Sequence, residues 1–151
     1  MNKYMKEAVK QASLGIRNGH GGPFGCVIVK DGSIIGRGHN MVVINNDPTC
    51  HGEIMAIRDA CAALQSFSLK GCELYTTAQP CPMCLGAILW AGIEKVYYGC
   101  NIGDTEKIGF KDSDFYKALN GGGGTELAEL DRDGCLEIFA EYAARTDNIK
   151  Y

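Results

Sequence analysis

The sequence lacks any apolar run long enough to cross a membrane. Its longest run, from Cys84 to Ile93, has ten residues and includes two glycines, whereas a spanning helix needs about 20. The N-terminal stretch also lacks the uninterrupted apolar segment of a secretion signal, because Lys3, Lys6 and Lys10 divide it. These two absences predict a cytoplasmic protein with reduced thiols and without a membrane partner.

The sequence also lacks an excess of positive charge. Its 15 Lys and Arg residues stand against 18 Asp and Glu, which gives a formal net charge of -3. Residues 104–151 are more acidic still, with 11 acidic and 6 basic side chains. Binding to a phosphate backbone needs clustered cations, so a nucleic-acid partner is not expected.

Low-complexity sequence is confined to Gly121–Gly124, which we expect to form a flexible loop. Proline and tryptophan are scarce, at four residues and one. The chain has 151 residues, of which 46% are hydrophobic, and domains typically run roughly 100 to 200 residues. These values predict a single domain over residues 1–151 with a sizeable apolar core.

Helical and strand patterns alternate along the chain. Residues 2–18 have the apolar spacing of an amphipathic helix, and Asp31-Gly32 forms a hairpin-turn signal between β-rich segments at 24–30 and 33–39. The other expected elements are helices around 54–61, 83–91, 112–119 and 131–144, and strands at 72–77 and 95–99. This alternation favours a layered α/β fold.

Three residues have the chemistry and spacing of a zinc site. Cys81 and Cys84 stand three apart at the start of an expected helix, so both thiols lie on one face. With His51 they offer three ligands of a tetrahedral zinc and leave the fourth position for a catalytic water. Glu53 is expected beside that water as a proton carrier. The alternative is a closed structural zinc with Cys50 as fourth ligand, which would leave Glu53 without a role.

The remaining cysteines lie in apolar patterns and are expected to be interior or near-surface thiols without a catalytic role. They are Cys26, Cys61, Cys72, Cys100 and Cys135.

The pairing of His51-Gly52-Glu53 with Pro80-Cys81-Pro82-Met83-Cys84 is the known signature of the zinc deaminases. The chain resembles the cytidine deaminase-like superfamily and, within it, the bacterial guanine deaminases over nearly its whole length. The other segments that carry the resemblance are Gly21 to Gly25, Asn45 to Thr49, Leu85 to Ile88, Gly109 to Ser113 and the terminal Tyr151.

This resemblance implies a three-layer α/β/α fold around a five-stranded mixed sheet. It implies that His51, Cys81 and Cys84 hold one zinc ion per subunit and that Glu53 shuttles protons. It also implies a homodimer in which the C-terminal segment, about residues 131–151, exchanges between subunits and closes the partner's pocket.

The resemblance also implies a set of substrate-binding residues. Asn40 would hydrogen-bond a ring carbonyl of the base, and Asp112 would accept hydrogen bonds from the N–H groups of a purine. Phe24 and Trp90 would form aromatic walls of the pocket. Tyr151 would belong to the closing tail.

The implied activity is zinc-dependent hydrolysis of a free nucleobase, from guanine to xanthine with release of ammonia. Cytosine deamination to uracil is the alternative. Gly52 and Gln79 depart from the residues usual in guanine deaminases, and Gly52, with Leu74 to Thr77, is similar to fungal cytosine deaminase. Editing of adenosine in tRNA is disfavoured by the acidic C-terminal third. A non-enzymatic zinc-stabilised interaction module would give Glu53 no role.

Overall fold

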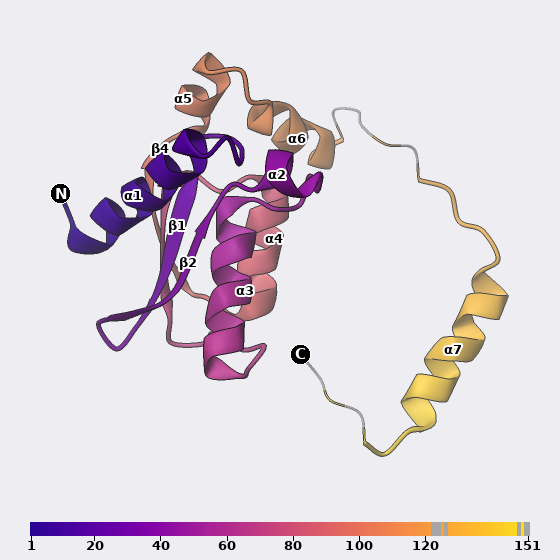
Figure 1. The fold of residues 1–151 in the computed structure, drawn as a ribbon. Helices are drawn as coiled ribbons and strands as arrows, with labels where there is room; N and C mark the ends of the chain where they lie inside the picture. The colour runs from indigo at the N-terminus through magenta and orange to yellow at the C-terminus, as the bar shows by residue number, and fades with distance from the viewer. Residues whose placement is uncertain (122–124, 126, 148, 150–151) are drawn as a thin grey trace.

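The computed structural model describes residues 1–121, 125, 127–147 and 149. Figure 1 shows a layered body followed by a C-terminal arm that leaves it. Residues 122–124 of the glycine run, where we expected a flexible loop, lie outside the described residues, as does Tyr151.

Helix α1 (Lys3–Arg17) confirms the amphipathic helix predicted for residues 2–18. The Asn2 side chain caps its first turn by accepting hydrogen bonds from the backbone N–H groups of Tyr4 and Met5. The chain then turns at Gly19, whose φ of +67° lies in the left-handed region that glycine adopts without strain.

Strands β1 (Gly25–Lys30) and β2 (Ser33–His39) form the predicted hairpin and pair antiparallel. The two turn residues, Asp31 and Gly32, have φ values of +48° and +77°. Two consecutive left-handed residues give the turn a twist that matches the flanking strands, so the Asp-Gly pair accounts for the tight connection.

The other elements of the body follow in chain order. They are α2 (Val42–Asn45), α3 (Gly52–Leu64), β3 (Glu73–Ala78), α4 (Pro82–Ala91), β4 (Lys95–Cys100), α5 (Ile102–Lys107) and α6 (Asp112–Leu119). The short helices α2 and α5 were not expected from the sequence, and the longer elements fall where the sequence predicted them.

The sheet is mixed, but within the described residues it has four strands rather than the expected five, in the order β2-β1-β3-β4. Strand β1 is antiparallel to both its neighbours, and β3 and β4 are parallel. After β4 the chain enters helix at once, because Asn101 and Asp104 form a capping box that starts α5. Within the described residues, strand β4 is therefore one edge of the sheet, and most of its residues are exposed.

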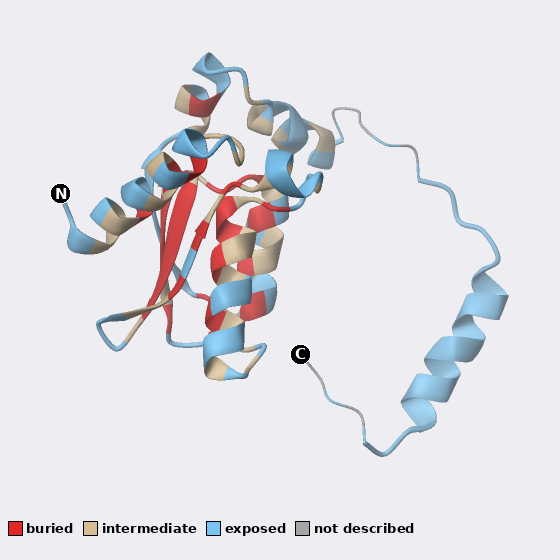
Figure 2. Ribbon diagram, in the orientation of Figure 1, coloured by how far each residue is buried: buried red, intermediate tan, exposed pale blue. Residues whose placement is uncertain are grey.

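Helices cover both faces of the sheet and complete the three layers (Figure 2). Helices α3 and α4 cover one face, where the larger core cluster forms, and α1 covers the other. The first cluster includes Cys26, Ile28, Leu74, Ala56, Ala60 and Ile88, and the second is formed by Val27, Val29 and Tyr75. The body is thus an α/β/α sandwich whose thickest packing lies beneath α3 and α4.

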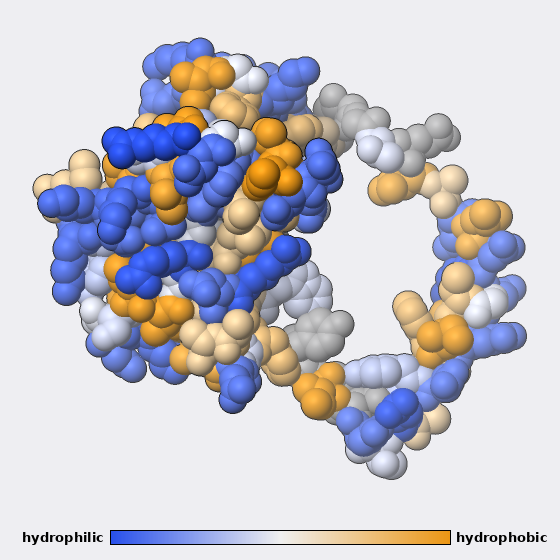
Figure 3. Space-filling view, viewed as in Figure 1, coloured by the Kyte–Doolittle hydropathy of each residue, from blue (hydrophilic) through white to orange (hydrophobic). Residues whose placement is uncertain are grey.

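Helix α7 (Arg132–Ala144) confirms the predicted C-terminal helix but lies apart from the body. Every residue of α7 is exposed, including Ile138 at 63% and Phe139 at 71%. Figure 3 shows this arm with hydrophobic side chains set among hydrophilic ones. The side chains of Ile138 and Phe139 are therefore largely open to solvent in this chain.

Within the described residues, no helix is long and apolar enough to cross a membrane.

Candidate metal centre and substrate cavity

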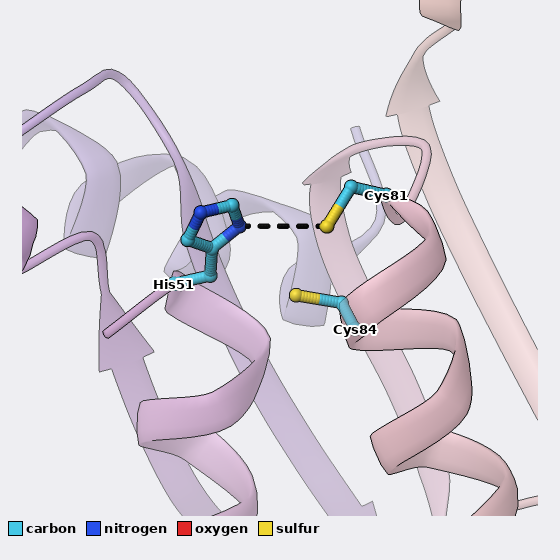
Figure 4. Close-up of side chains that lie close together, drawn as sticks. All are labelled: His51, Cys81 and Cys84. Carbon is cyan, nitrogen blue, oxygen red and sulfur yellow. Dashed lines mark hydrogen bonds between the residues drawn. The ribbon is translucent and has the colours of Figure 1, made fainter. Parts of the chain in front are cut away.

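The N-terminal ends of α3 and α4 bring the predicted zinc ligands together. His51 is the residue that precedes α3, Cys81 precedes α4, and Cys84 lies in the first turn of α4. One ligand atom from each residue lies within 4.8 Å of the others. In Figure 4 the imidazole of His51 faces both sulfur atoms, with 3.6 Å between His51 Nδ1 and Cys81 Sγ.

Two glycines of β2 allow α3 to lie close enough to the sheet for this arrangement. A Cβ atom at Gly38 would lie 2.4 Å from the backbone nitrogen of Ala56, and one at Gly36 would lie 2.5 Å from the carbonyl oxygen of Ala56. Because both obstacles are backbone atoms, a side chain at either position would push α3 outward. The position of His51 and Glu53 therefore depends on these glycines.

The two thiols lie in the same cluster, but their pKa values shift in opposite directions. A hydrogen bond from the Cys84 thiol and a second one with the His51 imidazole lower the pKa of Cys81 to about 4. The same hydrogen bond to Cys81, together with burial, raises the pKa of Cys84. A cation bound between the two sulfurs would displace the remaining proton, since the thiolate is the ligand form. A donor set of one imidazole and two thiols fits zinc and leaves a coordination position open.

Glu53 lies in the first turn of α3 beside this cluster and is 5% exposed. The hydroxyl of Thr76 donates to its Oε1 at 3.2 Å, and the Cys84 thiol lies 3.4 Å from its Oε2. Burial raises the pKa of Glu53 above its ordinary value. A carboxyl group of this kind exchanges protons more readily near neutral pH than an exposed glutamate does.

A cavity opens directly beside the cluster, and most of the predicted site residues border it. Its lining consists of Phe24, Asn40, His51, Glu53, Ala78, Gln79, Cys81, Phe110 and Asp112. Of these, Ala78, Gln79 and Phe110 were not assigned a role from the sequence. Phe110 lies within the segment Gly109 to Ser113, which resembles the guanine deaminases. That resemblance was the sequence signal that could have assigned Phe110 to the site.

Asn40 borders the cavity, and a backbone group fixes its side-chain amide. The side chain is 4% exposed, and its Oδ1 accepts a hydrogen bond from the backbone N–H of Val42 at 3.1 Å. With the oxygen engaged, the NH₂ group is the remaining polar end of the amide. Gly21 lies against this side chain, and a Cβ atom at position 21 would clash with Asn40 Oδ1.

Two further lining residues, Phe110 and Asp112, come from the α5–α6 segment. Phe110 meets Phe24 edge to face, with 4.7 Å between the ring centroids. Asp112 begins α6, and burial raises the pKa of its carboxyl group. Tyr116, one turn later, donates a hydrogen bond to the carbonyl oxygen of Pro80 at 2.8 Å, which ties α6 to the loop that carries Cys81.

Trp90 does not border this cavity. It lies near the C-terminal end of α4, 70% exposed, whereas the cluster is at the N-terminal end of the same helix. The structure therefore does not support Trp90 as a wall of the pocket within one chain.

Comparison with known proteins agrees with this geometry. Residues 1–100 match the family model of the cytidine and deoxycytidylate deaminase zinc-binding region. Guanine deaminase of Bacillus subtilis is 50% identical over 117 residues, covering 78% of this chain and 75% of that protein. The tRNA-specific adenosine deaminase of Aquifex aeolicus is 43% identical over 95 residues, covering 63% of this chain and 62% of that protein.

The structural comparison extends the likeness to the C-terminal arm. The crystal structure of Bacillus subtilis guanine deaminase has a TM-score of 0.93 and 41% identity, covering 100% of this chain and 99% of that one. The histidine and two cysteines lie within the matched region and have the geometry of a zinc site. The chain therefore belongs to the cytidine and deoxycytidylate deaminase family of zinc-dependent aminohydrolases.

Proposed function

We propose that this protein deaminates guanine to xanthine and releases ammonia. The observation that carries the proposal is the composition of one cavity, which is bordered by two of the three metal donors, His51 and Cys81, together with the buried carboxyl group of Glu53, the side-chain amide of Asn40 and the carboxyl group of Asp112. The likeness to Bacillus subtilis guanine deaminase over the whole chain supports guanine as the base.

The residues of this chain account for the proton transfers of the reaction. His51, Cys81 and Cys84 would hold zinc, which when bound supplies a Lewis acid that activates water. Glu53 takes a proton from the attacking water and delivers it to a ring nitrogen beside the amine-bearing carbon. Glu53 then carries the second proton of the water to the departing amine, so that guanine and water give xanthine and ammonia.

The other polar side chains of the cavity would orient the base. Asn40 would donate through its NH₂ group to the carbonyl oxygen of guanine, since its own oxygen is engaged by Val42. Asp112 would accept a hydrogen bond from a purine N–H. Phe24 and Phe110 would exclude water from the base with their rings.

We further propose that the protein is a homodimer whose C-terminal segment, about residues 131–151, packs on the partner subunit. Its support is the position of α7, whose apolar side chains Leu136, Ile138, Phe139 and Tyr142 are all exposed in the single chain. Exposed apolar side chains of this number on one helix are typical of an interface. Tyr151 would then belong to the segment that closes the partner's cavity.

Ammonia release from zinc-loaded protein tests the function. Guanine, cytosine, adenine and a tRNA anticodon stem are supplied at one concentration, with Glu53→Gln as the inactive comparison. Release from guanine is expected, and Glu53→Gln should lower it about a thousandfold while retaining zinc, because the proton carrier is lost. Glu94→Gln, at an exposed position, is the matched control and should keep full activity.

Each alternative predicts a different outcome. Release from cytosine with little from guanine would replace our proposal by cytosine deamination. Release from the anticodon stem alone would indicate tRNA editing. Equal rates for Glu53→Gln and the unaltered protein would exclude Glu53 as the proton carrier.

A further inference from the structure

Thr76 is a buried polar side chain on the face of the sheet where the larger core cluster forms. It is 1% exposed and lies on β3 opposite Cys26 of β1. Alternation along the strand places Thr76 on the same face as Leu74, beneath α3 and α4. A buried hydroxyl group that makes no hydrogen bond destabilises the folded protein. The group that accepts a hydrogen bond from Thr76 therefore indicates the role of this residue.

That partner is Glu53. The Thr76 hydroxyl donates to Glu53 Oε1 at 3.2 Å, and both groups are buried. The other oxygen, Oε2, lies on the side of Cys84, 3.4 Å from its sulfur. The two oxygens of the carboxylate thus have different surroundings, with Oε1 held by the sheet and Oε2 directed to the metal cluster.

We infer that Thr76 is a positioning residue that fixes the orientation of the Glu53 carboxylate. The terminal torsion of a glutamate side chain has a broad energy minimum, so the side chain alone does not define the plane of its carboxylate. The inference rests on the proposed function in one respect, because Glu53 must be the proton carrier for this orientation to affect the rate.

The orientation matters because Glu53 moves protons in two steps of the reaction. In both steps its oxygen must lie within hydrogen-bond reach of the reacting atoms. A displacement of about 1 Å in such a group can lower the rate about a hundredfold. Loss of the Thr76 hydroxyl would therefore reduce kcat, while substrate binding through Asn40 and Asp112 would be unaffected.

Two substitutions separate the hydroxyl from the shape of the side chain. Thr76→Val keeps the shape and removes the donor, and we expect it to lower kcat about tenfold to a hundredfold with KM and zinc content unchanged. Thr76→Ser keeps the donor and should retain most of the activity. Thr105→Val is the matched control, because Thr105 is also buried but donates to the carbonyl oxygen of Ile102.

A double variant shows whether Thr76 acts through Glu53. In the Glu53→Gln background, the further change Thr76→Val should leave the residual rate unchanged. An equal loss in both backgrounds, a matching loss in Thr76→Ser and Thr76→Val, or full activity of Thr76→Val would overturn the inference.

A crystal structure of zinc-loaded Thr76→Val gives a result that does not depend on the substrate. We expect the carboxylate of Glu53 to have turned from its position in the unaltered protein. An unchanged carboxylate would refute the positioning role even if the enzyme acted on another base. Failure of the proposed function would be recognised separately, as absence of guanine deamination by the unaltered protein.

Discussion

Asp112 borders the cavity from α6, whereas the metal donors and Glu53 lie at the starts of α3 and α4. Substitution of Asp112 by alanine should therefore spare zinc binding and remove one charged hydrogen bond to the purine. Such a bond contributes about 1.5–3 kcal/mol, so kcat/KM for guanine should fall roughly tenfold to a hundredfold. Steady-state kinetics and zinc analysis measure the two effects.

Asp114→Ala is the control for this prediction, because Asp114 lies on the same helix and points to Lys117 at 3.9 Å. It should leave guanine turnover unchanged. If Asp112→Ala were equally active, Asp112 would serve only as an acidic residue in the first turn of α6.

The residues predictable from the sequence are those with diagnostic spacing. The ligand set of His51, Cys81 and Cys84 follows from short motifs, and the fold places them together. Gln79 and Phe110 were not predicted, since they reach the cavity only through the packing of β3 and the α5–α6 segment. Trp90 was assigned to the pocket although the length of α4 carries it to the opposite end.

At the level of elements, the contact of α3 with β2 sets the position of His51. Gly38→Ala should destabilise the protein by about 1–3 kcal/mol, because the new methyl group meets backbone atoms of α3. Zinc affinity should fall with it, since α3 carries His51 and Glu53 at its start. Thermal unfolding and zinc titration measure the two quantities.

Gly103→Ala provides a comparison in a second helix. Its new methyl group would lie 3.2 Å from the side-chain oxygen of Asn101. This oxygen caps α5, so the disturbance would be confined to the start of α5 and would not reach α3. We expect normal zinc affinity for this variant. Normal affinity in Gly38→Ala would show that α3 can shift without moving His51.

The hydrogen bond from Tyr116 to Pro80 joins α6 to the metal-binding loop. Tyr116→Phe removes the hydroxyl alone and should raise KM for guanine several-fold, because α6 carries Asp112. Zinc content should not change. Tyr4→Phe is the matched control, since its hydroxyl also donates to one backbone carbonyl, that of Gly32, but far from the cavity. Equal KM values for both variants would contradict the prediction.

Elements defined by local signals were predictable, and the edge of the sheet was not. The hairpin follows from Asp31-Gly32, and α1 follows from its apolar spacing. The fifth strand was expected from the resemblance alone, and the chain after β4 instead forms helices. The capping residues Asn101 and Asp104 were a local signal for α5 that the sequence contained.

At the scale of the whole molecule, the body and α7 are separate in one chain. A protein that ends at residue 120 should retain zinc, because its ligands and their supporting elements all lie in the body. It should lose dimerisation and most of its activity on guanine if the tail completes the partner's site. Sedimentation and steady-state kinetics measure these properties. A truncated protein that remains dimeric and active would contradict the proposed exchange.

The distance between α7 and the metal cluster has a consequence for mixed populations of subunits. A subunit that ends at residue 120 has an intact Glu53 but no tail, and a Glu53→Gln subunit has the tail but no proton carrier. In a pair formed from the two, the shortened subunit would receive its partner's tail and so contain one complete site. Two inactive preparations would then regain part of the normal activity on mixing, with one complete site in each mixed pair.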